Sequence, residues 1–195
     1  RFAAWIGGLD VDALIAQSQL AREHRYALHK ARTAADHLMS PEEEALATEL
    51  KLTGSIAWAK LFNNYTSQIT ATVDLDGNPA TLPITAIRNL AYHEDRALRR
   101  RAYAAELAAW EAHSFPVAMA LNSIKGEMNT LSRRRGWDSP LDVALYENHI
   151  DRDTLDTMLS TARDYFPTLR RYLHAKAELL GLDRLAWFDL FAPVG

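Results

Sequence analysis

One stretch of this sequence, residues 69–84, alternates apolar and polar side chains, whereas apolar residues elsewhere recur at helical spacing. Ile69, Ala71 and Val73 are separated by threonines, the period of two that places alternate side chains on opposite faces of a strand. An Asp-Gly-Asn-Pro turn sequence follows, and a second alternating stretch returns from it. We therefore expect one antiparallel β-hairpin. Because an isolated hairpin is only marginally stable in water, it should pack against neighbouring helices.

The rest of the chain has the composition and end signals of α-helices. Of its 195 residues, 59 are alanine or leucine, which both favour helices. Ser40, Pro41 and Glu43 have the pattern of a capping box with proline at the first helical position. The expected helices cover residues 10–36, 41–52, 55–65, 95–112 and 116–135, then a short helix after Ser139 and Pro140 and a longer one from Asp151 towards Leu180. The sequence predicts a mainly α fold, a multi-helix lobe with one β-hairpin at about residues 69–84.

No repeat, linker or low-complexity stretch divides the chain, so we expect a single helical lobe over residues 1–195. Residues 1–37 are its leading helical segment, and residues 38–195 contain the other helices and the hairpin. The long first helix is predicted from Leu14, Ala21 and Leu28, which recur every seven residues. An isolated pair of glycines at positions 7 and 8 predicts a break before it.

Composition excludes several classes of protein. The chain is 48% apolar and 24% charged, with a formal net charge of −3, which argues against a disordered chain and against a general nucleic-acid binder. It has no cysteine, which excludes a disulfide scaffold and thiolate metal sites. No apolar run approaches the ~20 residues that span a bilayer, and no signal-peptide pattern opens the sequence. We predict a soluble, cytoplasmic protein that binds no membrane.

The seven histidines lack the spacing of a metal site. None lies three or four residues from another, so no helix presents two imidazoles on one face. A zinc-binding H-E-x-x-H pattern begins at His93 and Glu94, but Ala97 stands where the second histidine belongs. The sequence also has no G-x-S-x-G motif. We predict no catalytic, cofactor-binding or metal-ligating residue in this chain and expect histidines that cap helices or face solvent. A metal site built from separate helices is the alternative.

Two basic triplets, Arg99–Arg101 and Arg133–Arg135, have two interpretations. Three consecutive helical residues sweep about 200°, so neither triplet forms one basic face. The second triplet comes at a predicted helix end, where cations interact favourably with the helix dipole. We expect a structural role for both, with anion binding by one of them as the alternative.

The last ten residues before Gly195 are apolar and aromatic. Trp187, Phe188 and Phe191 fall within five positions, and exposed patches of this kind usually mark an interface. The sequence also begins at Arg1 rather than at methionine. We expect the natural protein to be longer, with this tail packed against a further domain. A tail folded back on its own lobe is the alternative.

Several stretches together carry a resemblance to a known family. They are residues 38–44, 53–58 with Thr66 and Ser67, the hairpin, 93–96 with 100–103, 121–124 leading to 135–137, and 173–182 followed by 187–194. In this order and at this spacing they resemble the N-terminal region of oligoendopeptidase F-type zinc metallopeptidases, of the thimet oligopeptidase-like superfamily. The resemblance begins near Glu23 and covers most of the chain.

The resemblance implies a helical lobe that forms one wall of a substrate channel. It also implies a C-terminal catalytic domain, outside this chain, that carries H-E-x-x-H and a downstream glutamate around a Zn²⁺ ion. The partners would be that domain and short peptide substrates, and this chain alone would be inactive. The hairpin and the helix over residues 95–112 are the candidates for lining the channel.

Two other functions stay open. One is a free-standing helical protein-interaction module without enzymatic activity. The other is an anion or nucleic-acid binder that uses the arginine triplets, and its binding would weaken steeply with salt.

Overall fold

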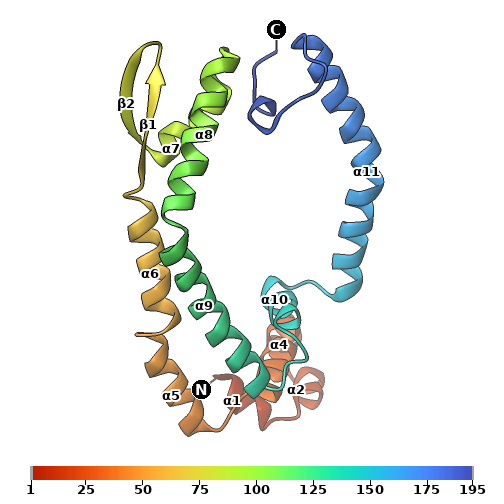
Figure 1. The fold of residues 1–195 in the computed structure, drawn as a ribbon. Coiled ribbons are helices and arrows are strands. Elements are labelled where there is room, and N and C mark those ends of the chain that lie inside the picture. Colours follow the sequence, from red (N-terminus) through yellow and green to blue (C-terminus); the bar gives the residue numbers. More distant parts are fainter. Residues whose placement is uncertain (1, 195) are drawn as a thin grey trace. The chain divides into compact units, whose positions relative to one another are not determined.

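The computed structural model describes residues 2–194, and these residues are mainly helical with one β-hairpin, as predicted (Figure 1). The first elements are α1 (Phe2–Gly7), α2 (Val11–Gln17), α3 (Gln19–Glu23), α4 (Arg25–Asp36), α5 (Pro41–Lys51), α6 (Ser55–Thr66), β1 (Thr70–Leu75) and β2 (Asn78–Pro83). They are followed by α7 (Ile84–Asn89), the 3-10 helix η1 (Leu90–Tyr92), α8 (Arg96–Ala112), α9 (Ser114–Arg134), α10 (Pro140–Asn148), α11 (Arg152–Leu179) and the 3-10 helix η2 (Trp187–Asp189).

Contacts within the chain group the residues into two compact units. Unit 1 contains the residues up to Ala57 and Ile124–His149, and unit 2 contains Trp58–Ser123 and the residues from Ile150 onward. Two of the three boundaries fall inside α6 and α9 and the third lies between α10 and α11, so the units are not successive domains along the sequence. The predicted single lobe over residues 1–195, with its leading segment 1–37, stays a prediction.

In unit 1, the single helix predicted over residues 10–36 is wrong. The chain forms α2, α3 and α4 there, because Ser18 adopts an extended backbone and its hydroxyl accepts the N–H of Ala21 at 3.3 Å. Serine competes in this way with the helical backbone and so favours helix ends. The predicted break at Gly7 and Gly8 is confirmed, but α1 precedes it. A Cβ on Gly7 would lie 2.6 Å from that of Ala35, so glycine lets α1 approach α4 closely.

The core of this part of unit 1 is small. Ile6, Val11 and Ala31 are buried together, and partly buried leucines and an isoleucine surround them. Of the residues in the seven-residue spacing, Leu28 packs against this core, whereas the core residues themselves lie outside the spacing.

The predicted capping box at the start of α5 is confirmed. The Ser40 hydroxyl accepts the Glu43 N–H at 3.3 Å, and the Glu43 carboxylate accepts the Ser40 N–H at 3.1 Å. The next residue, Glu44, receives two hydrogen bonds from Arg135 at 2.9 and 2.7 Å, which lower the pKa of its carboxyl group. The predicted break at Gly54 is also confirmed. A Cβ there would collide with the Glu127 carboxylate, which accepts the N–H and the hydroxyl of Ser55, each at 2.6 Å.

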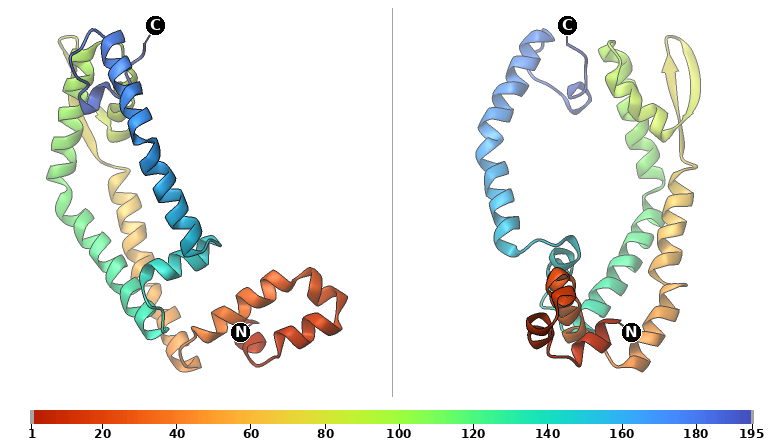
Figure 2. Two further views of the ribbon diagram at one scale, coloured as in Figure 1. Left: turned by 90° about the vertical axis from the view of Figure 1, so that its right-hand side faces the viewer. Right: turned by 180° about the vertical axis from the view of Figure 1, so that it is seen from behind.

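Unit 2 contains the predicted hairpin, packed on α7 and α8 (Figures 1 and 2). Val73 pairs with Ala80, and the turn between the strands uses left-handed backbone at Asp76 and Gly77. The Asp74 carboxylate accepts the Gly77 N–H at 2.6 Å. Val73 of the hairpin is buried with Ile87 of α7 and with Leu98 and Ala102 of α8. The hairpin therefore packs against helices, as expected because an isolated hairpin is only marginally stable.

The remaining predicted helices begin and end within two residues of the expected positions. The carboxylates of Asp95 and Asp151 cap α8 and α11, and Ser139 caps α10. Gly136 and Gly181 follow α9 and α11 with positive φ angles of 70° and 67°, which glycine adopts without steric cost. Within residues 2–194, no helix has both the length and the apolar character needed to cross a membrane.

Candidate functional site

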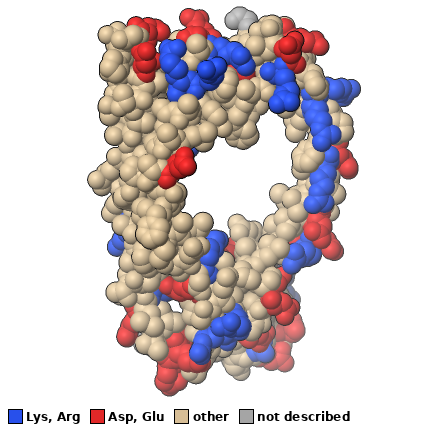
Figure 3. Space-filling model, in the orientation of Figure 1, with Lys and Arg blue, Asp and Glu red and all other residues tan. Residues whose placement is uncertain are grey.

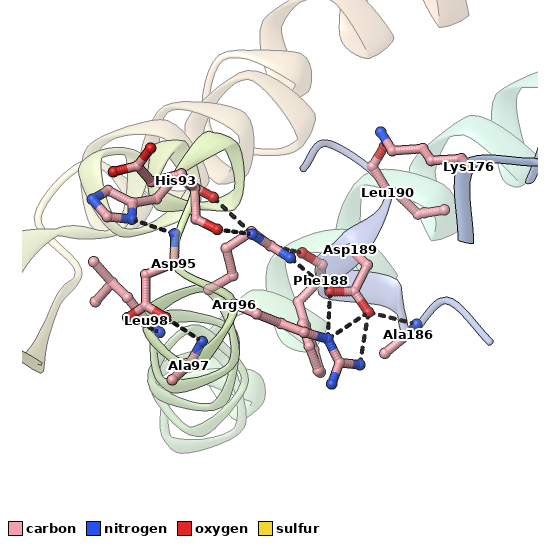
Figure 4. A network of polar contacts seen from close by, with 12 residues as sticks. His93, Asp95, Arg96, Ala97, Leu98, Lys176, Ala186, Phe188, Asp189 and Leu190 are labelled. Atoms are coloured by element: carbon pink, nitrogen blue, oxygen red, sulfur yellow. Dashed lines mark hydrogen bonds and ion pairs between the residues drawn. The ribbon is translucent and has the colours of Figure 1, made fainter. Parts of the chain in front are cut away.

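The C-terminal segment of unit 2 is fixed by one buried carboxylate. Asp189, in η2, is completely shielded from solvent and lies against the first turn of α8 (Figure 4). Arg96 donates to it from Nε and Nη2 at 3.1 and 2.9 Å, and Arg99 donates from Nη2 at 2.9 Å. The N–H of Ala186 completes the set at 2.9 Å. We call this group the Asp189 anchor.

Both the carboxylate and the buried guanidinium of the anchor have hydrogen-bond partners. Arg99 is also buried, and its guanidinium donates further to the carbonyls of His93, Glu94 and Phe188 at 2.8–3.1 Å. Burial acts to raise the pKa of the Asp189 carboxyl. The hydrogen bonds from Arg96, Ala186 and Arg99 outweigh burial, so the pKa lies below its ordinary value. The carboxylate is therefore ionised at neutral pH and positions the C-terminal segment rather than acting as a proton donor.

A cavity of about 570 Å³ lies beside the anchor, between α7, η1, α8 and η2. Aromatic side chains make up much of its wall: Tyr92, Tyr103, Trp110, Trp187, Phe188 and Phe191. The rings of Tyr103 and Phe188 are 6.0 Å apart, and those of Tyr92 and Phe191 are 5.2 Å apart. We call this cavity the aromatic pocket. Its size and lining are typical of a small-ligand or side-chain binding site.

One edge of the aromatic pocket is polar. The Glu106 carboxylate pairs with the Arg88 guanidinium and accepts the indole N–H of Trp110 at 3.4 Å. Both charged groups are thus already matched, and the lining contains no serine, cysteine or histidine to act as nucleophile or base. The pocket therefore has the chemistry of binding an apolar or aromatic group.

The histidines lie mostly at helix ends, as expected. His24, His37 and His93 are C-cap residues of α3, α4 and η1, and His113 and His149 follow α8 and α10 in the same position. The ring of His93 accepts the Asp95 N–H at 3.0 Å. The residues of the partial H-E-x-x-H match therefore lie in the connection between η1 and α8. Among residues 2–194, no group of three histidine, cysteine, aspartate or glutamate side chains is placed to hold a metal ion.

The arginine triplets are used inside the chain. Arg99 belongs to the Asp189 anchor, and Arg101 donates to the Asp74 carbonyl at 3.1 Å. In the second triplet, Arg134 pairs with Glu43 at 3.1 Å and Arg135 with Glu44 at 2.7 Å. These contacts favour a structural role for both arginine triplets. Anion binding by one of the triplets stays an untested alternative.

For the aromatic tail the structure shows the alternative, a tail folded back on its own unit, while packing against a further domain stays a prediction. It folds back on its own unit through Asp189 and through the Lys176 ammonium, which donates to the Leu190 carbonyl at 2.8 Å. Yet Trp187 and Phe191 stay 69% and 52% exposed. Sequence reasoning missed the anchor, because an aspartate within an aromatic run gives no sign of arginines about 90 residues earlier.

Comparisons with known proteins show which proteins this chain resembles. The family model of oligopeptidase F matches residues 9–70. Oligopeptidase PepF of Bacillus subtilis is 24% identical over 182 residues, which is 92% of this chain and 27% of that protein. Group B oligopeptidase PepB of Streptococcus agalactiae is 26% identical over 160 residues, which is 81% of this chain and 27% of that protein. The chain thus resembles part of a class of oligopeptidases and spans about a quarter of the length of these relatives.

The fold agrees with these matches. Oligoendopeptidase-F from Enterococcus faecium superimposes with a TM-score of 0.78 at 23% identity, covering 98% of this chain and 39% of that one. The predicted resemblance to the N-terminal region of oligoendopeptidase F-type peptidases is therefore confirmed.

Proposed function

We propose that this chain is the N-terminal, channel-forming helical lobe of a zinc-dependent oligoendopeptidase that hydrolyses peptide bonds in short peptides. The observation that carries the proposal is the match of 92% of the chain to only 27% of oligopeptidase PepF. Because the matched part is only about a quarter of that protein, its remaining residues are enough for a separate catalytic domain. The aromatic tail, with Trp187 still exposed, supports a further domain as its partner.

The residues of this chain do not fit a zinc site, since no suitable group of three donors exists among residues 2–194. The proposal therefore assigns zinc and the H-E-x-x-H motif to the C-terminal catalytic domain. Zinc in such a domain makes a bound water nucleophilic enough to attack a peptide carbonyl. The part left to this chain is to hold the peptide and to exclude bulk water and folded proteins.

The aromatic pocket supports the binding role. Leu107 and Trp110 of α8 line it, which agrees with the expectation that residues 95–112 contribute to the channel. Apolar and aromatic peptide side chains bury well on such a surface, and the Arg88–Glu106 pair offers polar partners at its edge. A cytoplasmic location and the absence of nucleic-acid and membrane partners stay predictions.

The test compares the product of the longer gene with the 195-residue chain on quenched fluorogenic peptides. We expect the longer protein to cleave short peptides, to lose activity with a zinc chelator and to regain it with Zn²⁺. We expect the 195-residue chain to be inactive under all these conditions. Zinc-dependent cleavage by the 195-residue chain would refute the division of labour, and a gene without a zinc-binding helix downstream would refute the peptidase assignment.

One observation favours a second candidate, the free-standing interaction module. The described residues of unit 2 leave a long apolar surface of α11 uncovered, and such surfaces mark protein contacts. A reading frame that ends close to Gly195, together with a stable monomeric product, would favour this module over the peptidase lobe.

A further inference from the structure

The helix α11 in unit 2 is strongly amphipathic. Its large apolar side chains fall within an arc of roughly 140° when drawn at 3.6 residues per turn, and they extend over about 21 Å of helix. The side chains of this α11 apolar face are Met158, Leu159, Tyr165, Phe166, Leu169 and Tyr172. The residues between them are mostly threonine, serine, aspartate and arginine, which take the other side. A stripe this wide is the pattern of a helix that packs on another element.

Within the described residues of unit 2, no element covers this face. From Asp156 to Tyr172 every residue of α11 is exposed, and the six apolar side chains retain 45–61% of their accessible surface. By contrast, Leu98 on the inward face of α8 retains 3%. A contiguous apolar strip of this size is rare on a free protein surface and marks an interaction site.

Two arginines stand beside the α11 apolar face. Arg163 and Arg170 fall within about 40° of its edge on the helical wheel, and Asp156 follows on the same side. In Figure 3 the Lys and Arg side chains along α11 are interspersed with Asp and Glu, and uncharged surface lies beside them. The partner that fits is therefore a mainly apolar surface, with an acidic or polar group opposite Arg163 and Arg170.

The path of the chain indicates which partner this is. After α11 the chain turns back, and Lys176 binds the Leu190 carbonyl across the end of the helix. A groove of about 430 Å³ lies there, lined by Leu173 and Ala177 of α11 and by Ala186 and Trp187 of the returning segment. The apolar surface of α11 thus continues into the C-terminal segment, so any polypeptide that follows starts beside this face.

We propose that the α11 apolar face is the docking surface for the catalytic domain of the same longer protein. This inference rests on the proposed function and adds the place of contact. A domain joined covalently near the face has a high effective concentration there, which favours it over a second copy of the chain. The relatives, of which this chain covers 27%, have the length to supply such a domain.

The test uses the absence of cysteine from the chain. Phe166→Cys places a thiol on the α11 apolar face, and Ser160→Cys places the matched control on the opposite side. Both variants are made in the longer protein and in the 195-residue chain, and maleimide labelling is followed at each site by peptide mass spectrometry. Leu169→Cys provides a second position on the face, and circular dichroism checks that helix content is kept.

In the longer protein we expect the thiols of Phe166→Cys and Leu169→Cys to be labelled about tenfold or more slowly than that of Ser160→Cys, as for a site exposed only by rare opening. In the 195-residue chain we expect equal rates. Equal rates in the longer protein would overturn the docking surface, and slow labelling of the 195-residue chain that depends on its concentration would assign the face to a second copy instead. Peptidase activity of the same samples reports on the proposed function independently.

Discussion

The helices α8 and α11 of unit 2 are both long and amphipathic, yet only one of them is covered. The apolar face of α8 receives the hairpin and α7, so that Leu98 and Ala102 are buried with Val73 and Ile87. Within the described residues of unit 2, α11 is buried only near its C-terminal end, at Lys176 and Ala177. Amphipathic sequence therefore specifies that a helix needs a partner, without specifying that the partner lies in the same chain.

The Asp189 anchor joins α8 to the segment that follows α11, and removing it should have the largest effect. Asp189→Ala leaves the buried Arg99 guanidinium without its carboxylate, which typically costs about 3–5 kcal/mol. We expect the free energy of unfolding, measured by urea denaturation, to fall by this amount. Asp183→Ala, an exposed residue of the same segment, is the control and should change it little. Similar stability of the two variants would show that the anchor does not hold the segment.

Paired leucine truncations test the contrast directly. Leu98→Ala removes a buried side chain of α8 and should cost about 2–5 kcal/mol of unfolding free energy. Leu169→Ala removes an exposed side chain of α11 and should change the unfolding free energy of the 195-residue chain by less than about 0.5 kcal/mol. In a longer protein with a covered α11 face, the cost of Leu169→Ala should rise towards that of a buried site. Equal costs in the 195-residue chain would mean that α11 is already packed.

Acid should release the C-terminal segment from α8. Since the pKa of Asp189 is lower in the folded chain than in the unfolded one, its stabilising contribution is full above the unfolded value of about 3.9. That contribution is lost as the pH falls through the lower, folded-state pKa. We expect pepsin digestion at decreasing pH to open cleavage sites in residues 184–192 before sites in α8. Simultaneous cleavage of both regions would argue against a separate acid-sensitive contact.

The helix caps should give the smallest effects and separate the two helices most finely. Asp95→Ala and Asp151→Ala each remove an N-cap carboxylate, at a cost of about 1 kcal/mol. In α8 tertiary packing should preserve the helix, whereas in α11 the first turns have no such support. We therefore expect amide hydrogen exchange in the first turn of α11 to accelerate more in Asp151→Ala than exchange in the first turn of α8 does in Asp95→Ala. The opposite order would indicate that α11 has tertiary support there.

Much of the local structure could be predicted, because short-range chemistry decides it. The box at Ser40 and Glu43, the turn at Asp76 and Gly77, and the caps at Asp95 and Asp151 are interactions between residues at most three positions apart. The failure of the predicted 10–36 helix has the same origin. Ser18 is a helix-capping residue type, but the seven-residue spacing of apolar residues favoured one continuous helix in the prediction.

The candidate site could be predicted only in pieces. The arginine triplet, the helix over residues 95–112 and the aromatic tail were each noticed, but their contact through Asp189 and Arg99 joins residues 90 positions apart. Chain closure over that distance has no local sequence signal. The pairing of Glu127 with Ser55 next to Gly54 escaped prediction for the same reason.

The sequence by itself determined the helices, the hairpin and their end points, since hydrogen bonds between near neighbours and side-chain periodicity settle these without reference to the rest of the chain. It also determined which face of each helix is apolar. Only the tertiary structure decided which of those faces are filled, because burial depends on what the chain brings back to them. It filled the face of α8, joined Asp189 to two arginines, and left the apolar face of α11 uncovered within the described residues of unit 2.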